Sequence, residues 1–312
     1  MRVEGMKKTV LFLLASMAAA VLAACGAAAL WAVPVLGQVP TAKTATLTGA
    51  GDIASCTEGR GLHGATAKLI GKIRGTVFTL GDNAYESGTS AEFDNCYGPT
   101  WGKYKARTRP AVGNHEYNTS GAMPYFEYFG RRAGAPGKGY YSYDRGSSWH
   151  VVVLNSNCNE VGGCTERSPQ GRWLSNDLAN NPSPCTLAYF HHSLYASGDK
   201  WDTLKVKPLW SMLYKGRAEV ILSGHAHRYE RYARITPEGQ KDRHNGIRQF
   251  IVGTGGKGED EPQQGKNDPR MQVRKVGTVG VLRLSLRADS YSWKFVPVEG
   301  ESFTDSGKDR CH

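Results

Sequence analysis

The sequence lacks the patterns that identify several common modules. It has no C-x-x-C pair among its seven cysteines, no zinc-finger spacing and no basic helix with heptads. It also contains no internal repeat and no low-complexity block. A zinc site built on cysteine and a nucleic-acid-binding module are therefore not supported. The formal net charge of +11 suits an anionic partner or substrate, although a solvated surface of mixed charge is the simpler explanation.

A further absence lies near the N-terminus, where no charged residue occurs over residues 9–42. Lys7 and Lys8 precede this apolar stretch, and a basic start before an apolar run is typical of an export signal. The sequence LAACG around Cys25 resembles a bacterial lipobox, in which Cys25 would carry the lipid. An uncleaved transmembrane anchor and plain secretion are the alternatives. All three place the rest of the chain outside the cytoplasm, either secreted or at the cell surface, because the basic flank stays inside.

The length and composition bound the domain organisation. The chain has 312 residues, of which 40% are hydrophobic, enough for one large domain with a real core or for two small ones. We predict a signal peptide over residues 1–25, a linker over 26–45 and a folded domain over 46–312.

The cysteine count agrees with an exported protein. Six cysteines remain once Cys25 is assigned to the leader, and this even number is compatible with three disulfides in an oxidising compartment. The predicted pairs are Cys158 with Cys164 and Cys56 with Cys96. Cys185 and Cys311 are then left without an assigned partner.

Strand and helix patterns alternate along most of the chain. Strand patterns occupy residues 45–52, 76–85, 109–117, 149–157, 185–193, 218–227, 247–256 and 279–298, the last containing a hairpin around residues 287–290. Helix patterns occupy residues 64–75, 168–181 and 207–216. This alternation predicts an α/β domain with packed sheets, a two-sheet sandwich flanked by helices.

Five of the predicted strands end in a polar residue of the kind that binds metals or substrates. These residues are Asp52, Asp82, Asn114, His191 and His225, and four of the five follow a glycine. In open α/β sheets, ligands gather beyond the carboxyl ends of the strands. We therefore expect these residues, although far apart in sequence, to converge on one edge.

Two neighbours extend this set, because Tyr85 and His227 each lie two or three residues from a member. The seven side chains offer oxygen and nitrogen donors and no thiolate, a mixture that suits iron, manganese or zinc. Seven donors are too many for one ion with an open site. They suit two ions that share a bridging carboxylate, roughly 3.5–4 Å apart.

The motifs that carry these residues resemble the metallophosphoesterase superfamily and, within it, the purple acid phosphatases. They stand in the family's order as Gly51-Asp52, Gly81-Asp82-Asn83-Ala84-Tyr85, Gly113-Asn114-His115-Glu116, Ala188-Tyr189-Phe190-His191 and Gly224-His225-Ala226-His227. The resemblance spans residues 51–231. It implies a calcineurin-like fold, a four-layer αββα arrangement with one catalytic domain over residues 46–312, of the bacterial type that lacks the extra domain of larger plant and fungal members.

The resemblance also implies a role for each matched position. Asp82 would bridge the two ions; Asp52, Tyr85 and His227 would complete the first site; and Asn114, His191 and His225 would complete the second. His115 would contact the substrate or protonate the leaving group. His192 has no match in the motif, and we treat it either as a substrate contact or as a neighbour.

Two departures from the family pattern fall beside the ligands. The family usually has glycine where Ala54 stands and valine where Ala188 stands. Many members also carry a histidine in the first motif, which Ile53-Ala54 lacks, and Tyr85 would supply a phenolate instead. A phenolate is a hard anionic donor, so we expect iron(III) at the first site and iron(II), zinc or manganese at the second.

The predicted function is that of an acid phosphatase, in which metal-bound hydroxide hydrolyses phosphate monoesters. The partner would be a small phosphorylated substrate. A phosphodiesterase or nucleotidase on the same scaffold is the nearest alternative, and a non-catalytic surface lipoprotein is the second. The glycine-rich residues 253–258 lack the lysine–hydroxyl pair of a P-loop, so we interpret them as a turn near the site.

Overall fold

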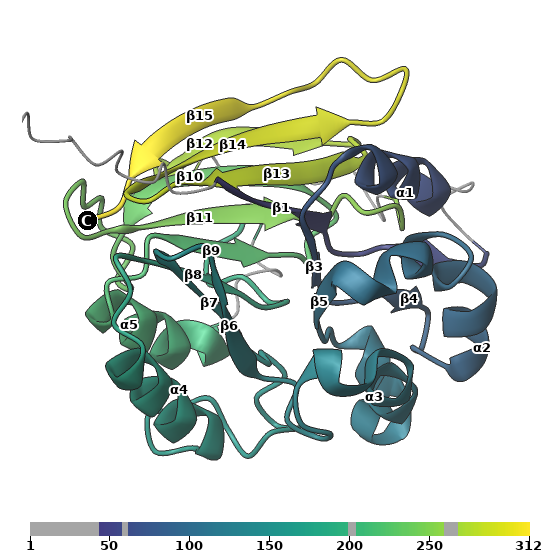
Figure 1. The fold of residues 1–312 in the computed structure, drawn as a ribbon, viewed down its shortest axis with the longest axis horizontal. Helices are drawn as coiled ribbons and strands as arrows, with labels where there is room; N and C mark the ends of the chain where they lie inside the picture. The colour runs from purple at the N-terminus through teal and green to yellow at the C-terminus, as the bar shows by residue number, and fades with distance from the viewer. Residues whose placement is uncertain (1–43, 58–61, 199–203, 259–267) are drawn as a thin grey trace, which may run out of the picture. The chain divides into compact units, whose positions relative to one another are not determined.

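Strands make up much of the part of the chain that the structure describes (Figure 1). The structure is a computed structural model and describes residues 44–57, 62–198, 204–258 and 268–312. The predicted signal peptide with Cys25, and the predicted linker up to residue 43, lie outside these residues and stay predictions. No helix within the described ranges is long and apolar enough to cross a membrane.

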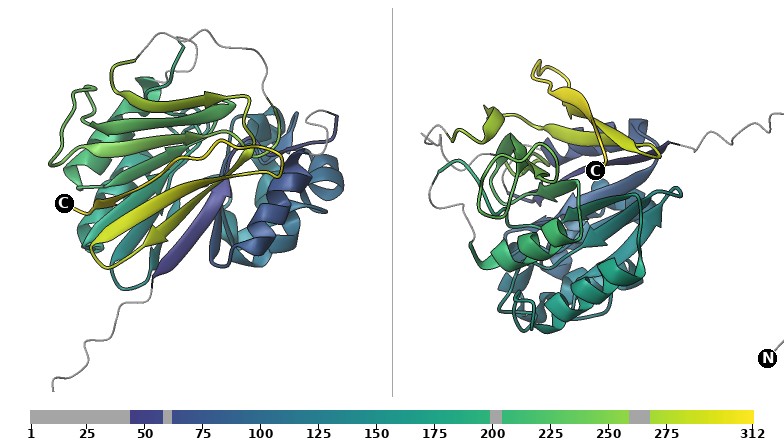
Figure 2. Two further views of the ribbon diagram at one scale, coloured as in Figure 1. Left: turned by 90° about the horizontal axis from the view of Figure 1, so that it is seen from above. Right: turned by 90° about the vertical axis from the view of Figure 1, so that its left-hand side faces the viewer.

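The first sheet has six strands in the order β15-β14-β13-β1-β3-β5. Its bounds are β1 Ala45–Ala50, β3 Thr76–Leu80, β5 Thr108–Ala111, β13 Gly280–Leu286, β14 Ser290–Pro297 and β15 Ser306–Arg310. Strands β1, β3 and β5 are parallel, whereas β13 and β14 form the predicted antiparallel hairpin. Figure 2 shows this C-terminal hairpin beside β1, with which β13 pairs.

The second sheet has seven strands in the order β12-β10-β11-β9-β8-β7-β6. Its bounds are β6 Tyr141–Arg145, β7 Trp149–Val153, β8 Cys185–Tyr189, β9 Val220–Ser223, β10 Arg228–Ile235, β11 Ile247–Val252 and β12 Met271–Val276. The four central strands β11, β9, β8 and β7 are parallel, so their carboxyl ends share one edge. The short strands β2 Ala54–Ser55 and β4 Ala84–Tyr85 form a separate parallel pair.

The helices connect these strands. The α-helices are α1 Leu62–Lys72, α2 Ser90–Glu92, α3 Met123–Phe129, α4 Pro169–Asn180 and α5 Lys207–Lys215. Shorter or irregular turns of helix are η2 Phe93–Tyr97, η3 Trp101–Arg107, η4 His115–Asn118, η5 Ser120–Ala122, η6 Gly130–Ala133 and η7 Leu204–Val206. Helix α4 begins as its sequence predicts, with Pro169 in the first turn and the Ser168 hydroxyl accepting from the Gly171 amide.

The seven-stranded sheet is buried on both faces. In β7, Val151 and Val153 pack into the core between the two sheets, whereas Val152 packs into the core shared with α4 and α5. Such alternation follows from the period of two along a strand. Leu174 of α4 and Trp210 of α5 cover this outer face. Figure 1 shows α4 and α5 on that side, and α1, α2 and α3 beyond β1, β3 and β5. The predicted two-sheet sandwich flanked by helices is confirmed.

The strand beside the edge strand β12 of the seven-stranded sheet was not predicted. Strand β10 has the sequence RYERYARI, whose charges do not suggest a buried strand. The structure buries Arg228 and Glu230 together, with the guanidinium Nε 2.6 Å from the carboxylate, and the Tyr232 hydroxyl donates to the same carboxylate at 2.8 Å. Because the charges satisfy one another, a strand that looks polar in sequence can lie inside the fold.

Three disulfides connect the six cysteines in the described residues. The predicted pairs Cys56–Cys96 and Cys158–Cys164 are confirmed, and the two left over form the third pair, Cys185–Cys311. Disulfides are typical of proteins that fold outside the cytoplasm.

Candidate metal centre

The five strand-end residues meet at one place, as their positions predict. His191 lies in the middle: its Nε2 atom is 3.2 Å from Oδ2 of Asp82 and 2.9 Å from Oδ1 of Asn114. The same Nε2 lies 3.2 Å from Nδ1 of His225. The amide of His225 donates to Oδ2 of Asp52 at 2.9 Å. The loops after β1, β3, β5, β8 and β9 thus contribute to a single cluster.

Tyr85 and His227 join this cluster from the other side. The phenol oxygen of Tyr85 lies 2.9 Å from Oδ1 of Asp52 and 3.0 Å from Oδ2 of Asp82, so its hydroxyl can donate to either carboxylate. Its oxygen is also 3.2 Å from Nε2 of His227, which is 3.3 Å from Oδ1 of Asp52. Asp82 Oδ2 therefore contacts both the Tyr85 group and the His191 group. This position, between two sets of donors, is the one that a bridging carboxylate would occupy.

Glycines before the cluster residues allow these close approaches. A Cβ atom on Gly113 would lie 2.0 Å from Oδ1 of Asp82, and one on Gly224 would lie 2.6 Å from Oδ2 of Asp52. The strand ends also carry left-handed backbone at non-glycine residues, with φ of 60° at Asp52, 49° at Asp82 and 69° at His225. Such conformations are uncommon and gather at functional sites.

Glu116 holds two of the loops in place. Its carboxylate is fully buried and accepts from the main-chain amides of Asn83 at 2.6 Å, Gly113 at 2.7 Å and Asp82 at 3.1 Å. Burial, and then the charge of Asp82, raises the pKa of Glu116 to about 7. The residue thereby joins the loop after β3 to the loop after β5, and so fixes the spacing between Asp82 and Asn114.

The pKa values of three cluster residues, Tyr85, His191 and Asp82, are shifted from their ordinary values. Burial, followed by the charges of Asp52 and Asp82, raises the pKa of Tyr85 well above its ordinary value. Burial alone would lower the pKa of His191, but the Asp82 carboxylate outweighs it and raises the pKa to about 9. Burial opposes the effect of His191 on Asp82, yet the imidazole prevails and lowers the pKa of that carboxyl group. Protons therefore neutralise the buried negative charge.

The donor set fits metal cations. The ligand atoms of Asp52, Asp82 and His191 lie within 4.8 Å of one another, and so do those of His191, His192 and His225. Nδ1 of His191 lies 2.7 Å from the carbonyl oxygen of Leu80, which can only accept, so Nδ1 carries the hydrogen. Nε2 is then the nitrogen available to a cation, and this carbonyl contact is the outer support usual for metal-binding histidines.

His115 sits at the rim of the cluster. Its amide donates to Oδ1 of Asp82 at 2.9 Å, and its Nδ1 lies 2.7 Å from the carbonyl oxygen of Glu86. Its Nε2 is 3.9 Å from Oδ2 of Asp82, and 28% of its side chain is exposed. The ring is therefore close to the cluster and open to solvent, as a residue that contacts substrate must be.

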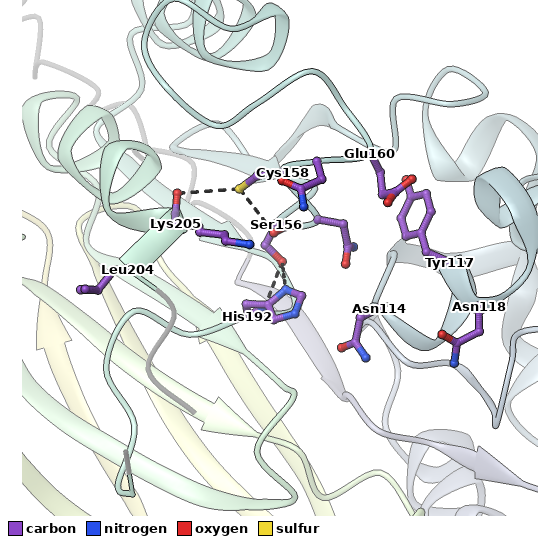
Figure 3. A pocket seen from close by; sticks show the side chains of 11 residues that line it. Asn114, Tyr117, Asn118, Ser156, Cys158, Glu160, His192, Leu204 and Lys205 are labelled. Carbon is purple, nitrogen blue, oxygen red and sulfur yellow. Dashed lines mark hydrogen bonds between the residues drawn. The ribbon is translucent and has the colours of Figure 1, made fainter. Parts of the chain in front are cut away.

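His192 lies beside the cluster. Its Nδ1 is 2.8 Å from the hydroxyl oxygen of Ser156, and its ring centroid is 4.4 Å from that of His225. Burial, and then the neighbouring rings of His191 and His225, lowers the pKa of His192 well below its ordinary value. His192 also lines a pocket of about 700 Å³ that reaches Asn114 (Figure 3).

Sequence reasoning missed two neighbours of the cluster, Ser156 and Lys257. Ser156 follows β7 at the same sheet edge, so the rule about strand ends could have found it. Lys257 belongs to the glycine-rich turn, which lies near the site as predicted, since its amide donates to the Asp52 carbonyl at 3.0 Å. Its Nζ is 2.7 Å from the Glu86 carboxylate and 5.0 Å from the centre of the Tyr85 ring. No spacing rule signals this contact.

Fold and cluster together define a phosphoesterase scaffold with a metal-binding edge. Residues 46–229 match the family described as calcineurin-like phosphoesterase, and the chain belongs to this family. It is 27% identical over 203 residues to probable purple acid phosphatase 20 of Arabidopsis thaliana, covering 55% of this chain and 43% of that protein. It is 29% identical over 189 residues to Fe(3+)-Zn(2+) purple acid phosphatase 12 of the same plant, covering 51% and 38%.

Solved structures show the same fold. A purple acid phosphatase from seeds of yellow lupin, Lupinus luteus, superposes with a TM-score of 0.67 at 16% identity, over 86% of this chain and 54% of that one. The chain spans less than half the length of the two Arabidopsis relatives.

Proposed function

We propose that this protein hydrolyses phosphate monoesters at a centre of two metal ions, as an acid phosphatase does. The observation that carries the proposal is the position of Asp82, whose Oδ2 lies 3.0 Å from the Tyr85 phenol and 3.2 Å from Nε2 of His191. A shared carboxylate between two donor groups suits two ions better than one. The names of the purple acid phosphatase relatives support the same reaction.

The two ions would be held by separate groups of residues. Asp52, Tyr85 and His227 would hold the first ion, and Asn114, His191 and His225 the second, with Asp82 bridging. Tyr85 would bind as a phenolate, which favours iron(III) at the first site with iron(II), zinc or manganese at the second. When bound, the ions would acidify a water to give the attacking hydroxide and offset the negative charge of the phosphate.

His115 would donate a proton to the leaving oxygen. The Glu86 carbonyl can only accept a hydrogen bond, so Nδ1 of His115 keeps its hydrogen. Nε2 is then the nitrogen that gains and loses a proton, on the side that faces Asp82. His192 would contact the phosphate or the leaving group as a neutral ring, because burial, and then the rings of His191 and His225, lower its pKa well below the ordinary value.

The basic composition suits a small anionic substrate, and the three disulfides suit a location outside the cytoplasm. We propose that the leader exports the chain as a secreted protein, with a lipid on Cys25, or with the leader kept as a transmembrane anchor. Mass spectrometry of the mature N-terminus would distinguish these routes, because only the lipoprotein begins at a modified Cys25 and only the anchored protein keeps the leader.

The central test combines metal content with substrate preference. Purified protein should contain close to two ions per chain, and it should hydrolyse p-nitrophenyl phosphate faster than bis-p-nitrophenyl phosphate. Asp82→Asn should lose both ions together, because it removes the shared charge. One ion per chain in wild-type protein, or a preference for the diester, would overturn the proposal.

A further inference from the structure

The pocket beside His192 has the size and position of a binding site for the leaving group. Its volume of about 700 Å³ falls within the roughly 300–1,000 Å³ of small-molecule pockets. Asn114 and His192 form its inner wall, so it opens directly onto the candidate metal centre. A phosphate held at that centre would place its ester group in this pocket.

The outer wall comes from a loop closed by a disulfide. Asn159 and Glu160 lie within the Cys158–Cys164 loop, and both line the pocket with exposed side chains. A loop closed by a disulfide between cysteines six positions apart has few alternative main-chain conformations, so the backbone that carries these side chains is held in position before a ligand binds.

The wall is rich in hydrogen-bond acceptors. The Nδ2 atoms of Asn118 and Asn157 donate to the main-chain carbonyls of Glu86 and Gly113, at 3.0 and 3.3 Å. These contacts fix both amide orientations, because a carbonyl only accepts, and they leave each Oδ1 without a donor among the described residues. The Glu160 carboxylate adds a further acceptor.

Charge is divided across the pocket. Figure 3 shows Lys205 on the His192 side and Glu160 near Tyr117 on the other. Lys205 thus lies on the side of the candidate metal centre, where the phosphate would bind. Glu160 lies on the opposite side, toward which the rest of the substrate would extend.

We infer that the natural substrate is the phosphate ester of a hydroxyl-rich alcohol, a sugar or other polyol. Hydroxyl groups would donate to Oδ1 of Asn118 and Asn157 and to the Glu160 carboxylate. A second phosphate would be repelled by Glu160, and an apolar alcohol would leave these acceptors desolvated and unpaired. This inference rests on the proposed function and names the substrate class of the same site.

Paired substrates and paired variants test it. Glucose 6-phosphate and cyclohexylmethyl phosphate share a primary-alcohol leaving group and differ in hydroxyls. Wild-type protein should show a kcat/KM for glucose 6-phosphate about tenfold above that for cyclohexylmethyl phosphate, the size of one hydrogen bond to a charged group. Glu160→Ala should remove about this factor through KM, because binding alone is weakened.

Glu166→Ala is the matched control, since Glu166 is an exposed residue close in sequence that pairs with Lys215 at 2.7 Å outside this pocket. It should leave the preference unchanged and hydrolyse p-nitrophenyl phosphate as wild type does. Equal rates on the sugar and cyclohexyl esters, or equal effects of the two variants, would overturn the inference alone. Protein that hydrolyses none of these esters would overturn the proposed function and the inference with it.

Discussion

The phenol oxygen of Tyr85 lies 2.9 Å from Oδ1 of Asp52, across a sequence separation of 33 residues. Asp52, Tyr85 and His227 form the group proposed to hold the first ion. The first motif supplies no histidine to this group, and the contact brings the Tyr85 phenol there instead. A phenolate bound to iron(III) absorbs visible light, so the contact predicts a coloured protein. Tyr85→Phe keeps the ring and removes the oxygen, and we expect the visible band to disappear from the iron-loaded variant.

Tyr97 supplies the control for this experiment. It is buried like Tyr85, but its ring packs against the rings of Phe93 and Phe129, which belong to the core and not to the cluster. Tyr97→Phe should keep the band. A band that survives in Tyr85→Phe, with iron still bound, would show that the phenol is not a ligand.

His115 should matter most when the leaving group is a poor one. General acid catalysis contributes typically 10²–10⁴-fold, and an alkoxide needs a proton far more than a nitrophenolate does. His115→Asn should therefore lower kcat by about 10²-fold or more on an alkyl phosphate and much less on p-nitrophenyl phosphate. Steady-state kinetics on both substrates would measure this, with the exposed His244→Asn as control. A uniform loss on both substrates would instead indicate a role in binding.

Sequence alone predicted the cluster because its residues obey a positional rule. Each of these residues follows a buried strand: Asp52, Asp82 and Asn114 follow β1, β3 and β5 of the six-stranded sheet, and His191 and His225 follow β8 and β9 of the seven-stranded sheet. Within each sheet the parallel strands bring their carboxyl ends to one edge, and the packing of the two sheets brings the two edges together. The fixed spacings within the motifs added Tyr85 and His227. The fold follows from the same alternation of strands and helices, and the pairing of Cys158 with Cys164 from their closeness in sequence.

The remaining features depend on contacts that no local pattern records. Lys257 reaches Glu86 across a sequence separation of 171 residues, and Cys185 reaches Cys311 across 126. Strand β10 looks polar until the pairing of Arg228 with Glu230 is known. These contacts become visible only when the sheets are assembled.

His150 gives the fold a dependence on pH. It is buried in β7, with Nδ1 2.9 Å from an Asp144 oxygen and Nε2 2.8 Å from an Asp177 oxygen. Burial alone would lower the pKa of His150, but the hydrogen bonds to Asp177 and Asp144 outweigh it and raise the pKa. The folded state therefore binds the proton of the His150 imidazole more tightly than the unfolded state does. In the unfolded state a histidine has a pKa of about 6.5.

The stabilisation from His150 should be fully present below about pH 6.5 and should disappear as pH rises through the raised pKa of the folded state. His150→Gln should thus lower the free energy of unfolding more at pH 6 than at pH 9. Urea unfolding of wild type and variant at a series of pH values measures this difference, in which other titrating groups cancel. A gap that stays constant across the series would contradict a charged His150.

The Cys185–Cys311 disulfide should contribute more stability than the Cys158–Cys164 disulfide. Cys185 begins β8 in the seven-stranded sheet, whereas Cys311 follows the edge strand β15 of the six-stranded sheet, so the bond ties the chain end to the opposite sheet. In the chain-entropy treatment, a closed loop of 126 residues stabilises by about 5 kcal/mol and one of six by about 2 kcal/mol. Replacing both cysteines of each pair by alanine and comparing the midpoints of urea unfolding tests this order.

Because β15 pairs only with β14 among the described strands, loss of the Cys185–Cys311 bond should also expose the last residues to proteolysis, while loss of the Cys158–Cys164 bond should leave them protected. Equal midpoints, or a C-terminus that resists protease in both variants, would show that strand pairing alone holds this end of the chain.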